Sequence, residues 1–153
     1  MNPSATGQIL VSAPPDRVYA LISDLAGLCS VAEETTRATI LGGGTSVSVG
    51  TRFRGRNKRG VFRWATTSTV TDASPGTRFA FDVTSLGVPV SRWQYDIEPA
   101  EGGCVVTEST WDRRPAWFYP IALLGTGVTD RVAVNTANIA RTLQRLKDKA
   151  ESA

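Results

Sequence analysis

The sequence predicts an α+β fold with an antiparallel sheet of six to seven strands and a long C-terminal helix. Short β-rich segments are separated by turns that contain Gly, Pro, Asn or Asp, and two short helices are expected after the first strand. From residue 129 onward, apolar residues recur at helical spacing. The length of 153 residues fits one domain of ordinary size, so we expect a single domain over residues 1–153.

The N-terminal part predicts one strand followed by two short helices. Residues 6–13 alternate weakly between apolar and polar types, which is typical of a half-buried strand. Pro15 and Asp16 favour a helix start, because proline suits the first helical turn. Apolar residues then follow at helical spacing, namely Val18, Leu21, Ile22 and Leu25. Asp24 is expected to cap a second helix that runs to about residue 32.

A meander of strands is predicted next. Residues 36–41 are β-rich and lead into three consecutive glycines. Further strands are expected at 50–57, 60–72, 77–85, 89–98 and 103–113. The segments between them, NKRG, DASPG, SLGVP and PAEGG, supply turn residues. Such short connections favour antiparallel neighbours.

The last third predicts an apolar segment and a long amphipathic helix. Residues 115–128 are mostly apolar and contain Pro120 and two glycines, and helical spacing dominates from residue 129 to the end. One stripe then continues to the end, through Val128, Val132, Asn135, Ile139, Leu143, Leu146 and Ala150. The Arg and Lys residues of this region lie off the stripe, as in a helix that packs one face on a core.

The absence of histidine excludes several classes of active site. A Ser-His-Asp or Cys-His nucleophile is impossible in this chain. The commonest transition-metal ligand is missing and the carboxylates show no metal-binding spacing, so we expect no metal and no other cofactor. Any acid or base would have to be Asp, Glu, Tyr, Lys or Cys.

The sequence predicts neither a signal peptide nor a transmembrane segment. Its first residues lack the cationic and apolar regions of a signal peptide. No apolar run approaches the roughly 20 residues that a membrane helix needs. We therefore expect a cytoplasmic protein. The net charge of +3 argues for solubility more than for nucleic-acid binding.

The basic stretch VGTRFRGRNKRGVFRW (49–64) is expected to form a two-faced hairpin. Its cations are Arg52, Arg54, Arg56, Lys58, Arg59 and Arg63. Strand alternation places the strand arginines on the outer face and Phe53, Phe62 and Trp64 on the inner face. The turn is expected over residues 57–60. The outer face would be solvated or would meet an anionic partner, and nucleic acid is disfavoured because no aromatic lies among its cations.

Three segments resemble the polyketide cyclase/dehydrase branch of the START-like (SRPBCC) superfamily. They are ISDLAGLCSVAEE, VGTRFRGRNKRGVFRWATTSTVTDASPGTRFAFDV and SRWQYDIEPAEGGCVVTES. The chain resembles especially the small actinobacterial members with a G-x-x-F-x-G-x-N hairpin. The resemblance implies the helix-grip fold of START and birch-pollen-allergen-like proteins. In that fold a curved antiparallel sheet wraps the C-terminal helix around an apolar cavity for lipids, polyketides or other hydrophobic molecules. Relatives often carry a Trp-Ser-Pro-Glu-like segment, of which CSVAEE keeps only the acid, at Glu33 or Glu34.

The inner faces of the predicted elements provide the candidate cavity residues. These are Phe53, Asn57, Phe62, Trp64, Phe79, Phe81, Trp93, Tyr95, Trp111, Asn135 and Ile139. The aromatics could instead form an ordinary core. Asn135 would bond to a polar neighbour or face a ligand, and Asn57 would serve either the turn or the cavity. Tyr95 would bond to a ligand or to a backbone carbonyl, whereas the parity of Glu108, opposite to that of Trp111, places it outside.

Binding of a hydrophobic small molecule is the leading functional hypothesis. The first alternative is a cyclase or dehydratase-type enzyme without metal or histidine, which needs a base and a donor for the developing enolate. Glu33 and Tyr95 are the candidates for its acid or base, although Glu33 could also be a solvated carboxylate at a helix end. The second alternative is a partner-binding module that uses the basic outer face.

The apolar segment 117–125, WFYPIALLG, allows two interpretations. It would pack over the cavity mouth, or it would form a mobile lid that touches a membrane transiently. Both a monomer and a homodimer are compatible with the sequence.

Overall fold

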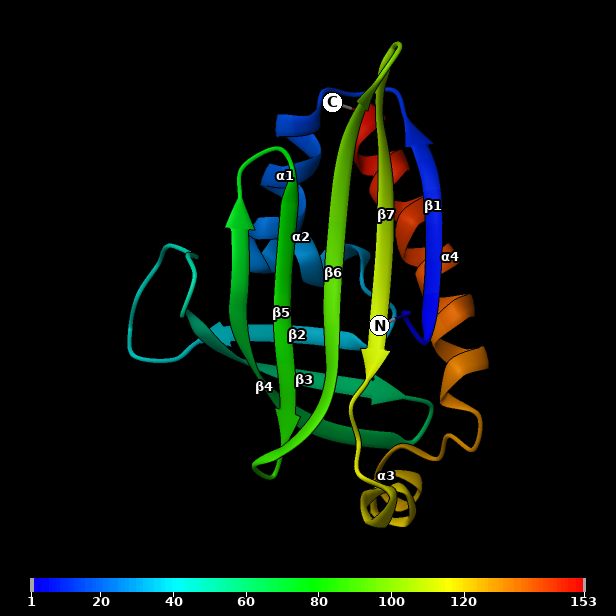
Figure 1. The fold of residues 1–153 in the computed structure, drawn as a ribbon. Helices are drawn as coiled ribbons and strands as arrows, with labels where there is room; N and C mark the ends of the chain where they lie inside the picture. Colours follow the sequence, from blue (N-terminus) through cyan, green and yellow to red (C-terminus); the bar gives the residue numbers. More distant parts are fainter. Residues whose placement is uncertain (1, 153) are drawn as a thin grey trace.

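The computed structural model describes residues 2–152, which form one antiparallel sheet and several helices (Figure 1). The strands are β1 (Ala5–Val11), β2 (Thr35–Ile40), β3 (Arg52–Arg59), β4 (Phe62–Ser74), β5 (Arg78–Ser85), β6 (Val88–Ala100) and β7 (Gly103–Asp112). The helices are α1 (Pro15–Ser23), α2 (Leu25–Val31), the 3₁₀ helix η1 (Ala116–Phe118), α3 (Tyr119–Thr126) and α4 (Arg131–Glu151). The predicted α+β helix-grip architecture is confirmed.

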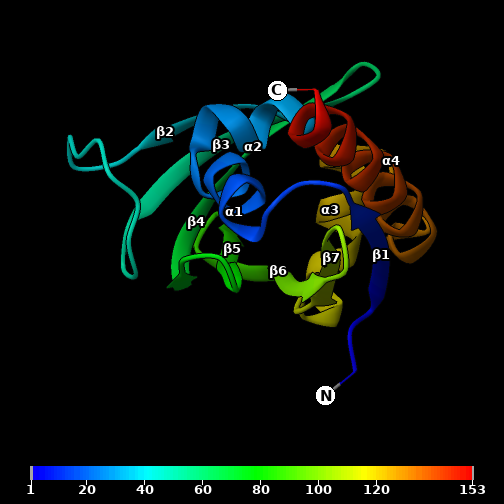
Figure 2. The ribbon, with the colours of Figure 1, turned by 90° about the horizontal axis from the view of Figure 1, so that it is seen from above.

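The sheet has the order β1-β7-β6-β5-β4-β3-β2 and is strongly curved. Figure 2 shows the sheet curving around the helices, with α1, α2 and α4 on its concave side. The pairing register shifts between Thr35 and Arg37, between Val70 and Asp72, and between Val83 and Thr84. Such irregularities bend the strand that carries the extra residue and increase its twist. The curvature therefore follows from the way these strands pair.

The two short helices form where the sequence predicts them. Pro15 occupies the first position of α1. The side chain of Asp24 accepts a hydrogen bond from the backbone N–H of Gly27 at 3.0 Å, which satisfies one of the free amides of the first turn of α2. The predicted cap is thus confirmed, and it holds α2 directly after α1 at the open side of the sheet.

The C-terminal helical region contains a break ahead of the predicted long helix. The apolar segment before it forms η1 and α3, and α3 ends at Gly127, whose φ of +71° is accessible to glycine at little cost. The long helix α4 begins at Arg131, with the side chain of Asp130 accepting from the N–H of Ala133 at 3.1 Å. The glycine separates the two helices, so α3 packs across the end of the sheet instead of extending α4.

Helix α4 packs against β1, where Gly7 makes the close approach possible. A Cβ atom at residue 7 would lie 2.7 Å from Cγ2 of Ile139, which is shorter than a normal contact. Most of the predicted stripe is buried, with Ile139, Leu143 and Leu146 almost inaccessible. Val132 is an exception, because it is about half exposed near the start of α4. The core therefore lies between α4, α1, α2 and the concave face of the sheet.

The basic hairpin has the two faces that alternation predicts, but its turn lies further along. Arg52, Arg54 and Arg56 are exposed and alternate with buried residues. Strand β3 continues to Arg59, which pairs with Phe62, so the turn is the two residues Gly60 and Val61 and does not cover residues 57–60. Gly60 has a φ of +59°, the positive value that a tight hairpin turn requires at this position.

Candidate ligand-binding cavity

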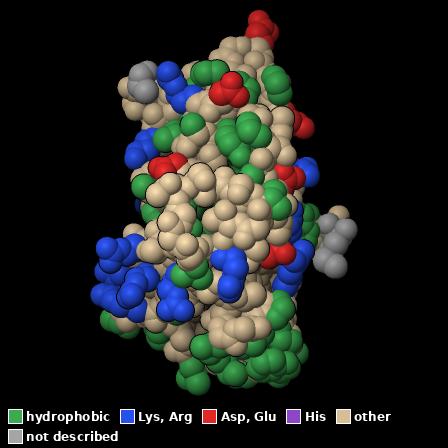
Figure 3. All heavy atoms as spheres, turned by 90° about the vertical axis from the view of Figure 1, so that its left-hand side faces the viewer, with side chains coloured by type: hydrophobic (Ala, Val, Ile, Leu, Met, Phe, Trp, Pro, Cys, Tyr) green, Lys and Arg blue, Asp and Glu red, His purple; other side chains and the backbone are tan. Residues whose placement is uncertain are grey.

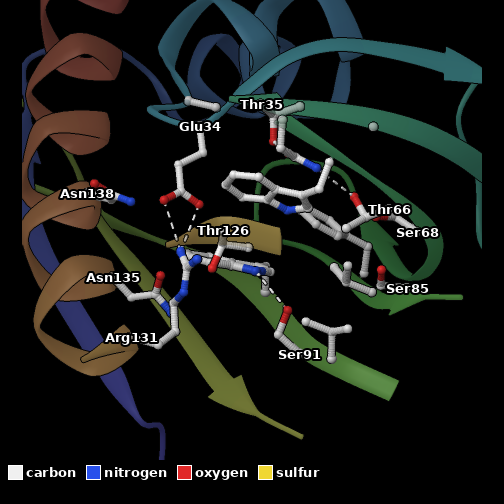
Figure 4. Close-up of a pocket in the computed structure, with 18 of the residues that line it drawn as sticks. Glu34, Thr35, Thr66, Ser68, Ser85, Ser91, Thr126, Arg131, Asn135 and Asn138 are labelled. Atoms are coloured by element: carbon white, nitrogen blue, oxygen red, sulfur yellow. Dashed lines mark hydrogen bonds and ion pairs between the residues drawn. The ribbon is translucent and has the colours of Figure 1, made fainter. Parts of the chain in front are cut away.

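A cavity of about 400 Å³ lies between the concave face of the sheet and α4. Residues from α2, β2–β7, α3 and α4 line it, and Figure 4 shows part of this wall. The volume falls within the range of about 300 to 1,000 Å³ that is usual for small-molecule sites. Sheet curvature produces this space, because one helix cannot fill the concavity of so strongly bent a sheet.

Most of the candidate residues line this cavity. They are Phe53, Asn57, Trp64, Phe81, Trp93, Tyr95, Asn135 and Ile139. Phe53 and Phe81 pack edge to face, with ring centroids 5.5 Å apart, and form one apolar wall. The indole N–H of Trp93 donates to Oγ of Ser91 at 3.2 Å, so this ring is held by a hydrogen bond within its own strand.

Three of the predicted cavity residues lie elsewhere. Phe79 is fully buried and packs edge-on against Tyr19 of α1 at 6.4 Å, so it belongs to the solid core. Phe62 is 37% exposed at the hairpin tip, where a Cβ at Gly127 would clash with its ring. Trp111 is half-buried on the other face of the sheet. Phe79 and Phe62 lie on the predicted faces of β5 and β4. Their positions along these strands, however, lie outside the stretch that borders the cavity.

Strand β7 presents the opposite face from the one predicted. Its buried alternate residues are Cys104, Val106, Glu108 and Thr110, so Trp111 points outward and Glu108 points inward. The sequence prediction places Trp111 on the inner face because large aromatic side chains are usually buried. The turn carries the correct signal, since Glu101 and Gly102 form a two-residue hairpin that pairs Glu108 with the inward-facing Tyr95.

Tyr95 and Glu108 form a buried hydrogen-bonded pair in the cavity wall. The Tyr95 hydroxyl donates to Oε1 of Glu108 at 2.8 Å, so its partner is neither of the two predicted ones. Burial raises the pKa of Glu108 to about 8, although the Tyr95 hydrogen bond lowers it. Burial also raises the pKa of Tyr95 well above its usual value, and the neighbouring Glu108 raises it further. This pKa favours the protonated form of the Glu108 carboxyl group at neutral pH.

Glu33 and Glu34 line the cavity but are bound by arginines of α4. Oε2 of Glu33 lies 2.6 Å from Nη1 of Arg145. Nη1 of Arg131 donates to both carboxylate oxygens of Glu34 at 2.9 Å, as the dashed lines in Figure 4 indicate. Arg131 also lies over the ring of Trp64, 5.9 Å from its centroid. The acid retained in CSVAEE therefore connects α2 and the start of β2 to the C-terminal helix.

A third ion pair closes the end of the cavity near α3. Arg114 donates to both carboxylate oxygens of Asp112, at 2.9 and 2.5 Å, and its guanidinium lies 4.6 Å from the ring centroid of Tyr119. Burial alone would raise the pKa of Asp112, but the hydrogen bonds and charge of Arg114, together with Arg131, lower it. The end of the cavity near α3 is therefore charged, and the two hydrogen bonds from Arg114 to Asp112 fix the positions of both side chains.

Polar side chains of α4 form a stripe along the cavity. Arg131, Asn135, Asn138 and Thr142 follow one another at spacings of three or four, and all line it. Figure 4 shows Arg131, Asn135 and Asn138 pointing inward from α4. Within residues 2–152, no hydrogen bond of the Asn135 side chain is found, and Oδ1 of the buried Asn138 has no partner. Asn138 follows the same helical spacing as Asn135, and this spacing could have identified it.

Asn57 is held by its strand neighbours and does not form the turn. Its Oδ1 accepts from the Thr35 hydroxyl at 2.8 Å, and its Nδ2 donates to Oγ1 of Thr66 at 3.1 Å. The amide therefore joins β2, β3 and β4 in the cavity wall. In the described part of the chain, no cluster of three or more Cys, Asp or Glu residues is arranged to hold a metal ion.

Comparisons with known proteins agree with this geometry. The family model described as "Polyketide cyclase / dehydrase and lipid transport" matches residues 2–151. No curated protein matches the chain significantly. Among solved structures, the Polyketide_cyc-like protein Cgl2372 from Corynebacterium glutamicum is 27% identical, with a TM-score of 0.62 over 95% of this chain and 90% of that chain.

Two further structures share the fold at lower identity. Protein CV1439 from Chromobacterium violaceum is 16% identical with a TM-score of 0.70, and the match covers 95% of each chain. The di-domain ARO/CYC StfQ from the steffimycin biosynthetic pathway is 17% identical with a TM-score of 0.74, over 96% of this chain and 50% of that one. The present chain thus corresponds in fold to about half of StfQ.

Proposed function

The chain belongs to the polyketide cyclase / dehydrase and lipid transport family, a branch of the START-like superfamily, and we propose that it binds a hydrophobic small molecule in the cavity between the sheet and α4. Residues 1–153 would act as a single cytoplasmic ligand-binding domain. The observation that carries this proposal is the cavity of about 400 Å³, walled by aromatic rings with a few polar side chains. A lipid, a polyketide or an aromatic metabolite fits this mixture of surfaces.

Native mass spectrometry of the freshly purified protein tests this function. A stoichiometric apolar adduct, released by denaturation and then identified, would support it and name the ligand class. As a control, Phe81→Arg places a charge on the apolar wall and should abolish the adduct. A clean mass, together with no uptake of fatty acids or flat polyphenols in solution, would count against ligand binding.

A cyclase or dehydratase activity is the second candidate function. The Tyr95–Glu108 pair favours it, because a buried carboxyl group with a pKa near neutrality suits proton transfer. Glu33 is less suited, since two arginines of α4, Arg141 and Arg145, neutralise it. The test is solvent deuterium exchange into the methyl group of 2-acetylnaphthalene, followed by NMR. Exchange that is accelerated by the protein and lost in Glu108→Gln would support catalysis, whereas no acceleration would leave binding alone.

The apolar end around α3 is the site where a membrane would be touched. The exposed apolar side chains at this end are Trp117, Tyr119, Ile121 and Leu124, together with Leu86 of the turn between β5 and β6. Figure 3 shows hydrophobic side chains gathered at this lower end, with Lys and Arg side chains close by. A membrane that carries negative charge fits this combination better than nucleic acid does. No helix within residues 2–152 combines the length and the apolar character that a bilayer span requires.

Vesicle sedimentation tests this contact. The protein should bind phosphatidylglycerol vesicles more tightly than phosphatidylcholine vesicles, and Leu124→Ser should weaken binding about fivefold or more. Leu10→Ser is the matched control, because Leu10 is also exposed but lies on β1, in another element. Equal binding by all three proteins, or no binding at all, would contradict the contact. Monomer and homodimer both remain compatible with this proposal.

A further inference from the structure

The cavity wall contains one carboxyl group that has no cationic partner. The charged residues that line the cavity are Glu33, Glu34, Glu108, Asp112, Arg114 and Arg131. Of these, all except Glu108 take part in ion pairs. Paired charges hold elements together, as those of Glu34 and Asp112 do here. Glu108 has no such role, and so its presence in an apolar cavity needs another explanation.

The surroundings of Glu108 leave one of its oxygens unused. Oε1 accepts from Tyr95 of β6, but the buried Oε2 has no hydrogen-bond partner. Its other strand neighbour, on β1, is Gly7, which brings no side chain and lets Ile139 of α4 approach. An unsatisfied buried polar group costs roughly 1 to 3 kcal/mol, so native proteins rarely keep one without a function.

A second unpartnered atom belongs to another residue that lines the same cavity. Oδ1 of Asn138, on α4, is buried and has no partner among the described residues. Asn138, Ile139 and Thr142 are the uncharged residues that α4 presents to the cavity in this region. Among residues 2–152, the titratable group that hydrogen-bonds to Glu108 is the Tyr95 hydroxyl. The wall offers one free carboxyl group and one free amide oxygen.

We propose that Glu108 is the polar anchor of the cavity, and that its protonated carboxyl group donates a hydrogen bond from Oε2 to a carbonyl oxygen of the ligand. This inference rests on the proposed ligand-binding function. Oδ1 of Asn138 can accept from a hydroxyl group of the same molecule. The ligand is thus an apolar ketone, and the hydroxyketones are the subclass that would satisfy both atoms.

The protonation state of Glu108 supports its role as the hydrogen-bond donor to the ligand. Because burial raises the pKa of Glu108 to about 8, the group is a donor at neutral pH and becomes a pure acceptor above that value. Since Tyr95 already donates to Oε1, the proton of the neutral acid is available on Oε2. A ligand carbonyl, which only accepts, therefore gains a partner at neutral pH and loses it in alkali.

A matched pair of probes tests the proposal. Binding of 2-acetylnaphthalene and of 2-isopropylnaphthalene, which has a similar shape but no carbonyl, is measured by calorimetry and by quenching of Trp64 and Trp93. The wild-type protein should prefer the ketone about tenfold at pH 6 and lose this preference at pH 9. Glu108→Gln, whose amide can still donate, should keep the preference at both pH values.

Two more variants complete the test. Glu108→Leu should lose the preference at both pH values while still binding the hydrocarbon. Glu98→Gln makes the same chemical change at an exposed carboxylate outside the cavity and should behave as wild type. Should Glu108→Leu fail to fold, the contrast between wild type and Glu108→Gln at pH 9 decides alone. Equal affinity of the wild type for both probes at pH 6 would overturn the anchor and leave ligand binding intact. If neither probe nor a fatty acid binds, the proposed function itself fails.

Discussion

Two carboxyl groups on one face of β7 have opposite electrostatic environments. Glu108 and Asp112 are four residues apart, and both point into the cavity. Burial raises the pKa of Glu108 to about 8, with only a tyrosine as its hydrogen-bond partner. For Asp112, burial is outweighed by the hydrogen bonds and charge of Arg114, so its pKa is lowered.

This difference separates two parts of one cavity. At the end near α3, carboxylates and arginines form ion pairs that tie η1 and α3 to the end of β7. Deeper, next to Gly7 and Ile139, the wall is neutral and offers single hydrogen-bonding atoms instead of charges. A charged pair recognises its own partner, whereas an unpaired neutral group can recognise a ligand. The same residue type thus has a structural role at one position and a proposed binding role at the other.

Removing the titrating group of Glu108 gives the largest expected effect. The pKa of this carboxyl is about 8 in the folded protein and about 4.5 in a solvent-exposed chain. Its contribution to stability is therefore fully present below pH 4.5 and is lost as the pH rises to about 8. Relative to the wild type, Glu108→Gln should gain about 1.4 kcal/mol in free energy of unfolding per pH unit across this window.

Urea unfolding at pH 5, 6, 7 and 8 measures this gain. The two proteins should differ least at pH 5, and the difference should grow steadily with pH. Parallel stability curves for wild type and Glu108→Gln would show that Glu108 is ionised in the folded state. In that case the contrast with Asp112 would disappear.

The opposite sign is expected at Asp112. Its lowered pKa stabilises the folded protein above the usual aspartate value, and this contribution is lost as the pH falls through the folded pKa. Asp112→Asn should cost about 2 kcal/mol at pH 6, because a charge-assisted hydrogen bond is lost. Thermal unfolding at pH 6, 4 and 3 should show this cost shrinking toward acid. A constant cost would indicate that packing, not charge, is what the variant disturbs.

Tyr95→Phe sharpens the comparison at the neutral end. It removes the hydroxyl that donates to Glu108 and leaves Oε1 without a partner, so the free energy of unfolding should fall by about 1 kcal/mol. Because this hydrogen bond lowers the pKa of Glu108, that pKa should rise further in the variant. NMR titration of the Glu108 carboxyl carbon in both proteins measures the shift. A midpoint that moves downward would refute this role of Tyr95.

The smallest effect is expected at the charged end, from Tyr119→Leu. Arg114 lies 4.6 Å from the centre of the Tyr119 ring, and a cation–π contact at a partly exposed site contributes about 0.5 kcal/mol. Thermal unfolding at pH 6 should show a loss of this size, with the Asp112–Arg114 pair intact. A loss as large as that of Asp112→Asn would mean that the ring, and not the carboxylate, positions Arg114.

Local patterns predicted the elements and most of the faces. The turn residues located every strand, the helical stripe located α4, and Pro15 and Asp24 located the starts of α1 and α2. Alternation failed on β7, because its two faces are almost equally apolar and the large ring of Trp111 favours the outer one as the buried face. The two-residue turn at Glu101 and Gly102 contains the missing information, because it sets the register that places Glu108 opposite Tyr95.

Outside β7, the sequence by itself determined which residues point inward, since a strand alternates with a period of two and a helix with a period of 3.6. Only the tertiary structure decided what each inward residue meets. Phe79 and Phe81 share one face of β5, yet the first packs on Tyr19 of α1 and the second borders the cavity. Periodicity reports direction but not height along the strand. That height depends on where the bulges bend the sheet and where α1 and α4 cross it, and these contacts join residues far apart in the chain.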